Sequence, residues 1–171
     1  MISEKLEAAI NDQINAELYS AYLYLSMAAY FEDINYAGFA NWMRVQFQEE
    51  QFHAQKMFDN LIDRGGKVVL KQIDAPPVEW DSPVAVFEAT LEHERLVTKR
   101  INDLIYLARD ERDNAAEIFL QWYVNEQVEE EDTAETLLSQ LKMAESSPHS
   151  MLMLDRELAG RVFTPPGQGK E

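Results

Sequence analysis

The chain has 171 residues, of which 46% are hydrophobic and 27% are charged, and its formal net charge at pH 7 is −16. This length and hydrophobic content predict one domain with a sizeable core. The negative charge, with no basic patch in the sequence, argues against binding to nucleic acid or to an anionic membrane surface. The chain has no Cys for disulfides or thiolate metal sites, and it shows neither a signal peptide nor a membrane-spanning apolar run, so we expect a cytoplasmic protein.

The first part of the sequence predicts two long antiparallel helices. The first begins after the N-cap residue Ser3 and continues to about Asp33, with apolar residues at helical spacing at Leu6, Ile10, Ile14, Leu18, Ala21, Leu25 and Ala28. The second runs from about Tyr36 to Arg64, where Gly65 and Gly66 end it. Its apolar face carries Phe39, Met43, Phe47, Ala54, Met57 and Leu61.

Residues 65–81 predict a long crossover, because Pro76 and Pro77 forbid a helix there. Two further helices follow, over 83–110 and 113–144, and a short fifth helix runs from Ser147 to about Gly160. Two helical pairs joined by one long crossover indicate an all-α fold, the ferritin-like four-helix bundle, here with a short C-terminal fifth helix. We place the bundle and its fifth helix in residues 1–164 and a flexible C-terminal tail in residues 165–171.

Polar residues interrupt the apolar faces of all four long helices at matching depth. They are Glu17 in the first, Glu50 and His53 in the second, Glu94 in the third, and Gln127 and Glu130 in the fourth. A carboxylate that faces a core is costly unless it is hydrogen-bonded, paired or bound to a metal. Each residue alone is equally well explained as a satisfied polar side chain, but the whole set at one depth favours a shared metal site.

Charge balance and ligand chemistry narrow the choice of metal ion. Four glutamates bring four negative charges, which two divalent ions neutralise. Carboxylates with one imidazole and no thiolate favour Fe²⁺ over Cu⁺ or structural Zn²⁺, although Mn²⁺ and Zn²⁺ remain alternatives in vitro. Without metal, the crowded carboxylates would take up protons as a coupled group. We therefore expect metal binding to stabilise the fold.

A second acidic group neighbours the first in sequence and consists of Glu49, Glu126 and Glu129. Residues 126–132 are a charge run, and such runs usually form a solvated face, so a third metal site and a solvated face are equal alternatives. Tyr24 is either a redox partner or a core tyrosine bonded to a carboxylate. His93 is expected to be structural or exposed, because it points about 100° away from its neighbour Glu94.

The chain closely resembles the non-haem ferritins of bacteria and archaea over nearly its whole length. The resemblance rests on residues 15–24, on the motifs Glu49-Glu50-Gln51-Phe52-His53 and Gln127-Val128-Glu129-Glu130, on Glu94 and on the fifth helix. It implies that Glu17, Glu50 and His53 bind a first iron, with Glu50 bridging, and that Glu94, Glu130 and nearby Gln127 serve a second. It further implies a third iron site at Glu49, Glu126, Glu129 and Glu130.

The resemblance also implies a function. Such proteins form a hollow shell of twenty-four subunits that oxidises Fe²⁺ with dioxygen or hydrogen peroxide and stores Fe³⁺ as a mineral. Haem is not expected, because bacterioferritins have a second Glu-x-x-His where this chain has Gln127 to Glu130, and a haem-ligating Met where it has Phe52. The alternatives are a rubrerythrin-like di-iron peroxidase or oxidase without a storage role, and a purely structural bundle whose buried acids are hydrogen-bonded.

Overall fold

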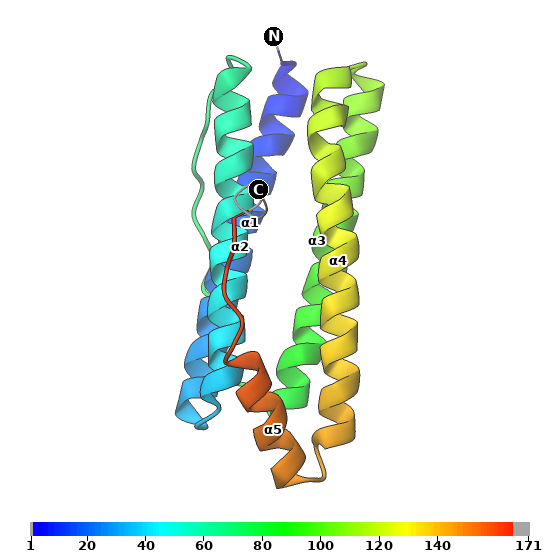
Figure 1. Ribbon diagram of the computed structural model, residues 1–171. Coiled ribbons are helices and arrows are strands. Elements are labelled where there is room, and N and C mark those ends of the chain that lie inside the picture. Colours follow the sequence, from blue (N-terminus) through cyan, green and yellow to red (C-terminus); the bar gives the residue numbers. More distant parts are fainter. Residues whose placement is uncertain (1, 166–171) are drawn as a thin grey trace.

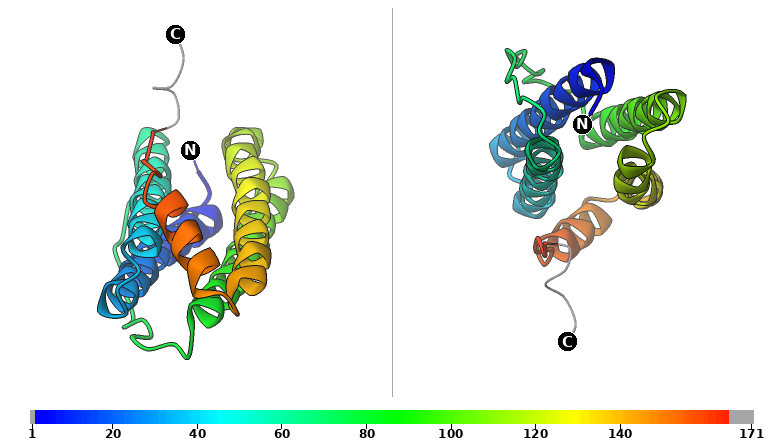
Figure 2. Two further views of the ribbon diagram at one scale, coloured as in Figure 1. Left: turned by 60° about the horizontal axis from the view of Figure 1, so that its bottom comes forward. Right: turned by 90° about the horizontal axis from the view of Figure 1, so that it is seen from above.

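The computed structural model describes residues 2–165, and these form five helices. The helices are α1 (Glu4–Asp33), α2 (Ala37–Asp63), α3 (Pro83–Asp110), α4 (Asn114–Ala144) and α5 (Pro148–Leu158). The antiparallel pair α1 and α2 lies beside the antiparallel pair α3 and α4, and α5 lies at one end of the bundle (Figures 1 and 2). The predicted all-α bundle with a fifth helix is confirmed. Residues 166–171 of the predicted tail lie outside the described part of the chain, and the domain boundary stays a prediction.

Local sequence explains where the helices begin. The side chains of the N-cap residues accept hydrogen bonds from backbone N–H groups at the starts of four helices, at Ser3, Ser82, Asp113 and Ser147. Pro83 and Pro148 occupy first helical positions, where the missing N–H costs nothing. The predicted helix bounds therefore agree with the structure to within a few residues.

The start of α2 is capped by another helix. Its N-cap residue, Tyr36, makes no capping bond with its side chain. Instead, Asp155 of α5 accepts hydrogen bonds from the backbone N–H groups of Gly38 and Phe39, at 2.8 and 3.0 Å. A Cβ at Gly38 would lie 1.6 Å from the carbonyl oxygen of Asp155, so this close contact requires glycine. The docking of α5 and the start of α2 therefore depend on each other.

The crossover from α2 to α3 is extended and runs along the flank of the bundle (Figure 1). The Asn11 side chain fastens it to α1, because its amide donates to the carbonyl of Lys67 and its oxygen accepts from the N–H of Val69. Further along, Ser26 donates to the carbonyl of Pro77. The β-prone residues 68–70 form no strand, since the described part of the chain offers them no partner strand.

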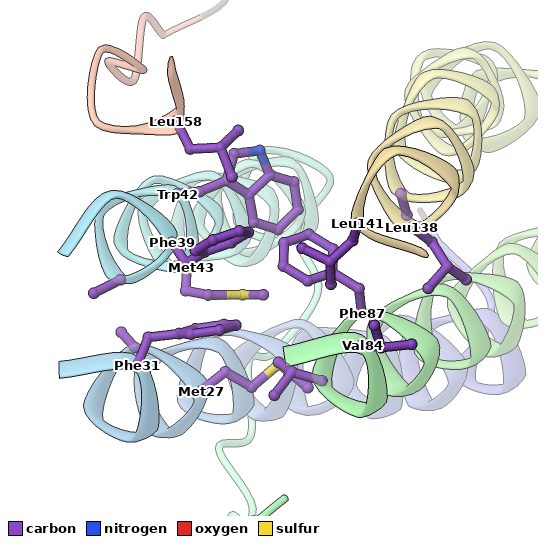
Figure 3. Packing of buried hydrophobic residues seen from close by; sticks show 14 of the residues in the cluster. Met27, Phe31, Phe39, Trp42, Met43, Val84, Phe87, Leu138, Leu141 and Leu158 are labelled. Carbon is purple, nitrogen blue, oxygen red and sulfur yellow. The ribbon is translucent and has the colours of Figure 1, made fainter. Parts of the chain in front are cut away.

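Buried apolar residues form two clusters, one towards each end of the bundle. The first lies near α5 and includes Phe31, Phe39 and Phe87, whose rings pack against one another (Figure 3). The second lies at the opposite end and includes Leu6, Ile10, Met57, Ile101 and Leu120. Along each long helix, the polar positions singled out in the sequence fall between residues of the two clusters. The core thus has a polar middle layer.

The prediction of the apolar face of α1 was wrong at one residue. Leu25, expected on the apolar face, is 40% exposed, while the adjacent Tyr24 is fully buried. Successive helical residues lie about 100° apart, so the next residue of this face after Ala21 can follow at three or at four positions, and here it is Tyr24, three positions on.

None of the helices in the described residues has the length and apolarity needed to cross a membrane.

Candidate metal centre

All six polar residues predicted for the centre lie in the middle layer, at most 7% exposed: Glu17, Glu50, His53, Glu94, Gln127 and Glu130. They come from all four long helices. Tyr24, which is fully buried, joins them. The folded bundle therefore gathers residues that are up to 113 positions apart, since Glu17 and Glu130 are the outermost of the six in sequence.

Glu17, Glu50 and His53 form the tightest group. One possible ligand atom from each lies within 4.8 Å of the others, and Nδ1 of His53 is 3.5 Å from a carboxylate oxygen of Glu50. Oε2 of Glu17 and Oε2 of Glu50 are buried and have no hydrogen-bond partner. Unpartnered buried carboxylate oxygens are costly, and a bound cation would satisfy them. This half of the layer fits a metal ion.

Neutral donors hold the carboxylates of the other half. The Tyr24 hydroxyl donates to Glu94, and the side-chain amide of Gln127 donates to Oε2 of the same residue at 3.1 Å. The side-chain amide of Gln46 donates to Oε2 of Glu130 at 2.8 Å. Each carboxylate is thereby oriented without being neutralised, so it keeps its capacity to bind a cation.

The layer has little positive charge of its own. Among the described residues, no Lys or Arg forms an ion pair with its glutamates. Burial, with the nearby Glu94, Glu17 and Glu130, raises the pKa of Glu50 well above its ordinary value. Burial and the charge of Glu130 raise the pKa of Glu94 to about 8. Without a cation, the layer therefore holds protons that carboxylates normally release.

Burial acts on His53 in the opposite direction. It lowers the pKa of His53, although the charges of Glu17 and Glu130 oppose the shift. The imidazole is therefore neutral at pH 7 and keeps a nitrogen lone pair for a metal. The hydroxyl of Tyr123 donates to the backbone carbonyl of His53 at 2.8 Å, which fixes this part of α2 against α4.

Beside the middle layer lies the flanking acidic group, formed by Glu49, Glu126 and Glu129. A carboxylate oxygen of Glu126 is 3.9 Å from Nε2 of His53, whereas Glu129 is exposed. Burial raises the pKa of Glu49 and of Glu126 to about 7 each. Unlike the buried glutamates, Glu49 has a cationic partner, because Arg161 forms an ion pair with it at 2.6 Å. The predicted third site is thus only half-buried and already carries a positive charge.

Comparison with known proteins identifies the family. Residues 7–144 match the ferritin-like domain family, named Ferritin. The chain belongs to the ferritin family. A bacterial non-heme ferritin from Bacteroides fragilis is 46% identical over 161 residues, which cover 94% of this chain and all of the relative. A bacterial non-heme ferritin from Staphylococcus epidermidis is 42% identical over 163 residues, 95% of this chain and 98% of the relative.

Solved structures agree with this assignment. An open pore ferritin from the hyperthermophilic archaeon Archaeoglobus fulgidus is 55% identical, with a TM-score of 0.94 over 95% of this chain and all of that one. A closed form of the same ferritin, engineered by site-directed mutagenesis, has a TM-score of 0.95 at 55% identity and covers 96% of this chain and all of that one. The resemblance to non-haem ferritins of bacteria and archaea is confirmed.

In this ferritin, sequence reasoning missed two buried glutamines. Gln13 donates through its amide nitrogen to Oε1 of Glu17 at 2.8 Å, and its oxygen accepts from Arg100 at 2.9 Å. Gln46 likewise donates through its amide nitrogen to Oε2 of Glu130 at 2.8 Å. A signal existed, because each glutamine lies four residues, about one helical turn, before a predicted ligand, Glu17 or Glu50. Positions one turn from a ligand face the same layer.

His93 lies beside the centre of this ferritin and not in it. Its Nε2 is 2.7 Å from the Ser20 hydroxyl, and its ring meets the Tyr24 ring edge-on at 6.1 Å. Burial lowers the pKa of His93 to about 4, so the ring is neutral. Of the two alternatives that the sequence left open, structural or exposed, the structure shows the first, a hydrogen-bonded histidine packed against Tyr24.

Proposed function

We propose that this chain is an iron-storage protein with ferroxidase activity, whose substrate Fe²⁺ binds in pairs in the middle layer. Glu17, Glu50 and His53 would hold one ion, and Glu94 and Glu130 the other, with Glu50 bridging. The observation that carries the proposal is the set of four buried glutamates from four helices that lack a cationic partner among the described residues. Membership of the ferritin family supports it.

The chemistry follows from the pairing of the ions. Two ferrous ions together supply the two electrons that reduce one dioxygen to hydrogen peroxide, or one hydrogen peroxide to water. The chain's own contribution is to hold both ions close, to offer carboxylates that tolerate Fe²⁺ and Fe³⁺, and to keep the site away from bulk water. The apolar clusters on either side of the layer provide this exclusion.

Tyr24 and Gln127 fit positioning roles in this proposal. Burial and the charge of Glu94 raise the pKa of Tyr24 well above its ordinary value, so the phenol stays protonated and its hydroxyl donates a hydrogen bond to Glu94. Gln127 donates to the same carboxylate. The roles of Gln127 as an iron ligand and of Tyr24 as a redox partner stay predictions.

Storage requires a closed assembly, which we propose to be a shell of twenty-four subunits in the cytoplasm. Large apolar side chains that the monomer leaves exposed support an assembly, among them Tyr22 on α1, Met143 on α4, and Leu152 and Met153 on α5. The substitution Met153→Asp tests this. We expect sedimentation velocity to show a large particle for the native chain and smaller species for the variant, whereas a native monomer would exclude storage in a shell.

The ferroxidase proposal is tested by mixing the metal-free protein with Fe²⁺ in aerated buffer and following ferric absorbance in a stopped-flow instrument. We expect Glu50→Ala and His53→Ala to lose the fast phase, and Glu92→Ala, an exposed glutamate on α3, to keep it. Equal rates in all four proteins would exclude a ferroxidase centre in the middle layer. A peroxidase or oxidase without storage, the alternative, would turn over iron without retaining it as a mineral.

A further inference from the structure

The chain after α5 returns along α2 towards the middle of the bundle (Figure 1). We call residues 159–165 the return segment. The side-chain amide of Asn41 on α2 donates to the carbonyl of Leu158 at 3.1 Å and to that of Arg161 at 3.0 Å. One side chain thus holds the end of α5 and the first part of the return segment against α2.

The return segment has a second anchor beyond Arg161. The ring of Phe163 packs against Phe52 with the ring centres 6.2 Å apart, and Phe52 in turn meets Trp122 of α4. Phe52 directly precedes the predicted ligand His53. The segment therefore lies over the α2 residues beside the metal centre, and Arg161 lies at its first anchor, two residues before the second.

The side chain of Arg161 is held from two sides. Its guanidinium lies over the ring of Trp42 at 4.7 Å from the centroid, and it pairs with Glu49 at 2.6 Å. Both partners of the pair are largely shielded, since the side chains of Arg161 and Glu49 are 25% and 21% exposed. A charge-assisted bond in such a place is stronger than a surface ion pair.

Glu49 belongs to a crowded set of acids. The negative charges of Glu130 and Glu126 both raise the pKa of Glu49, and the charge of Glu130 also raises the pKa of Glu126. Lys56 is near Glu126, but its ammonium lies over the ring of Trp122. In the described part of the chain, Arg161 is the cation that pairs with this set at hydrogen-bond distance. Its Nη1 is buried and has no partner among residues 2–165, so charge and not complete hydrogen bonding holds the guanidinium there.

We propose that Arg161 is the resident cation of the flanking acidic group, and that a third metal ion binds Glu49 and Glu126 only when the return segment moves Arg161 off Glu49. A guanidinium and a metal ion cannot share this carboxylate without repulsion. Glu126 and Glu130 connect the flanking group with the centre, so Arg161 also opposes the movement of iron from the centre towards Glu126. The inference rests on the proposed function, because it assumes a two-metal centre beside the group.

Zinc titration tests the inference, since Zn²⁺ prefers similar ligands and does not oxidise. Isothermal calorimetry on the intact, assembled protein at pH 7 should show two tight ions per subunit and a weak third. We expect Arg161→Met, which keeps an unbranched chain over Trp42 but no charge, to bind the third ion about tenfold more tightly. Arg161→Lys keeps the charge and should bind it much as the native protein does. Arg156→Met, an exposed arginine on α5, is the matched control.

The outcomes separate this inference from the proposed function. If the native protein lacks the two tight ions, the two-metal centre itself is refuted. If the two tight ions bind but Arg161→Met gains nothing at the third site, the role of Arg161 alone is refuted. Crystals of Arg161→Met with Zn²⁺ provide a second readout, because a retained return segment with no metal between Glu49 and Glu126 would also overturn the inference.

Discussion

The middle layer and the flanking acidic group contain the same kind of residue in adjacent positions, yet the structure treats them differently. Glu50 is 1% exposed and has an unpartnered oxygen, while its neighbour Glu49 is half-buried and paired with Arg161. Glu130 is buried and hydrogen-bonded to a neutral amide, while its neighbour Glu129 is exposed. The two members of each pair point about 100° apart around the axis of their helix.

This difference shows what separates a metal centre from an ordinary acidic cluster. Both regions concentrate negative charge, but among the described residues an arginine pairs with the flanking group through Glu49, and no Lys or Arg pairs with the glutamates of the middle layer. The middle layer is supplied with neutral donors, Gln13, Gln46, Tyr24 and Gln127, which orient carboxylates and leave their charge available. Buried carboxylates without a cationic partner therefore indicate a metal centre better than the number of acidic residues does.

A cation placed in the middle layer should make that layer behave like the flanking acidic group. Gln46 is fully buried and donates to Glu130, so the ammonium of Gln46→Lys would pair with that carboxylate and repel a metal ion. We expect Zn²⁺ affinity at the centre to fall by at least about a hundredfold. Calorimetry is the measurement, with Gln48→Lys, an exposed position on the same helix, as the control. Native affinity in Gln46→Lys would show that charge does not decide between the two regions.

Removing a neutral donor should have a smaller effect. Gln13→Leu deletes the amide that orients Glu17 and removes the acceptor of Nε of Arg100, whose other nitrogen still donates to the carbonyl of Asp12. We expect metal affinity at the centre to fall by about tenfold, the effect typical of groups that orient metal ligands. Gln48→Leu is the matched control in the same titration. If Gln13→Leu binds as tightly as the native chain, the neutral donors do not tune the centre.

The pH dependence of the metal-free protein should reveal the missing counter-charge. Burial raises the pKa of Glu94 to about 8, so the folded state holds a proton there that the unfolded chain releases near its ordinary value of 4.5. The folded state then binds more protons than the unfolded state, and stability falls as pH rises towards 8, by at most about 1.4 kcal/mol per pH unit for this group. Glu50, whose pKa is also raised, acts in the same direction.

Protonation of His53 sets the lower limit of the pH range in which this fall in stability can be measured. Its pKa is lowered, so below the ordinary histidine value of 6.5 the unfolded state takes up a proton that the folded imidazole refuses, and stability falls with acid. Thermal unfolding of metal-free protein between about pH 6.5 and 8 is therefore the test. Glu94→Gln should make the slope shallower, while Glu50, Glu49 and Glu126 still contribute to it, and Glu92→Gln should leave it unchanged. Stability that rises with pH in this range would contradict the account.

The smallest expected effect concerns the support of the flanking group. Asp155→Ala removes the cap that α5 provides for α2, at Gly38 and Phe39, and should lower the free energy of unfolding by about 1 kcal/mol. Because the return segment follows α5, its hold on Glu49 should loosen, and third-site zinc affinity should rise slightly while the centre is unaffected. Thermal unfolding and calorimetry measure the two effects, with Glu157→Ala, exposed on the same helix, as the control.

The sequence predicted the helices and the gathering of the polar layer well, for physical reasons. Caps such as Ser3 and Ser82 and the stop at Gly65 are local signals, and helical spacing places Glu17, Glu50, Glu94 and Glu130 at one depth. The exact seam was less predictable, since Tyr24 and Leu25 are both apolar enough to be buried and only packing decides between them.

What the sequence could not show were contacts between distant residues. Arg161 and Glu49 are 112 positions apart, and nothing local indicates that the chain after α5 returns to α2. The cap that Asp155 provides for Gly38 of α2 spans 117 positions. For the same reason, the charge run from Glu126 to Asp132 left the choice between a metal site and a solvated face open.

We propose that the middle layer, whose glutamates pair with no Lys or Arg in the described part of the chain, binds two metal ions. Anomalous diffraction from crystals soaked anaerobically in Fe²⁺ tests it most directly. We expect two strong iron peaks per subunit, one between Glu17, Glu50 and His53 and one between Glu50, Glu94 and Glu130, with a weak peak or none at Glu49. Iron peaks confined to the protein surface, with none in the middle layer, would contradict it.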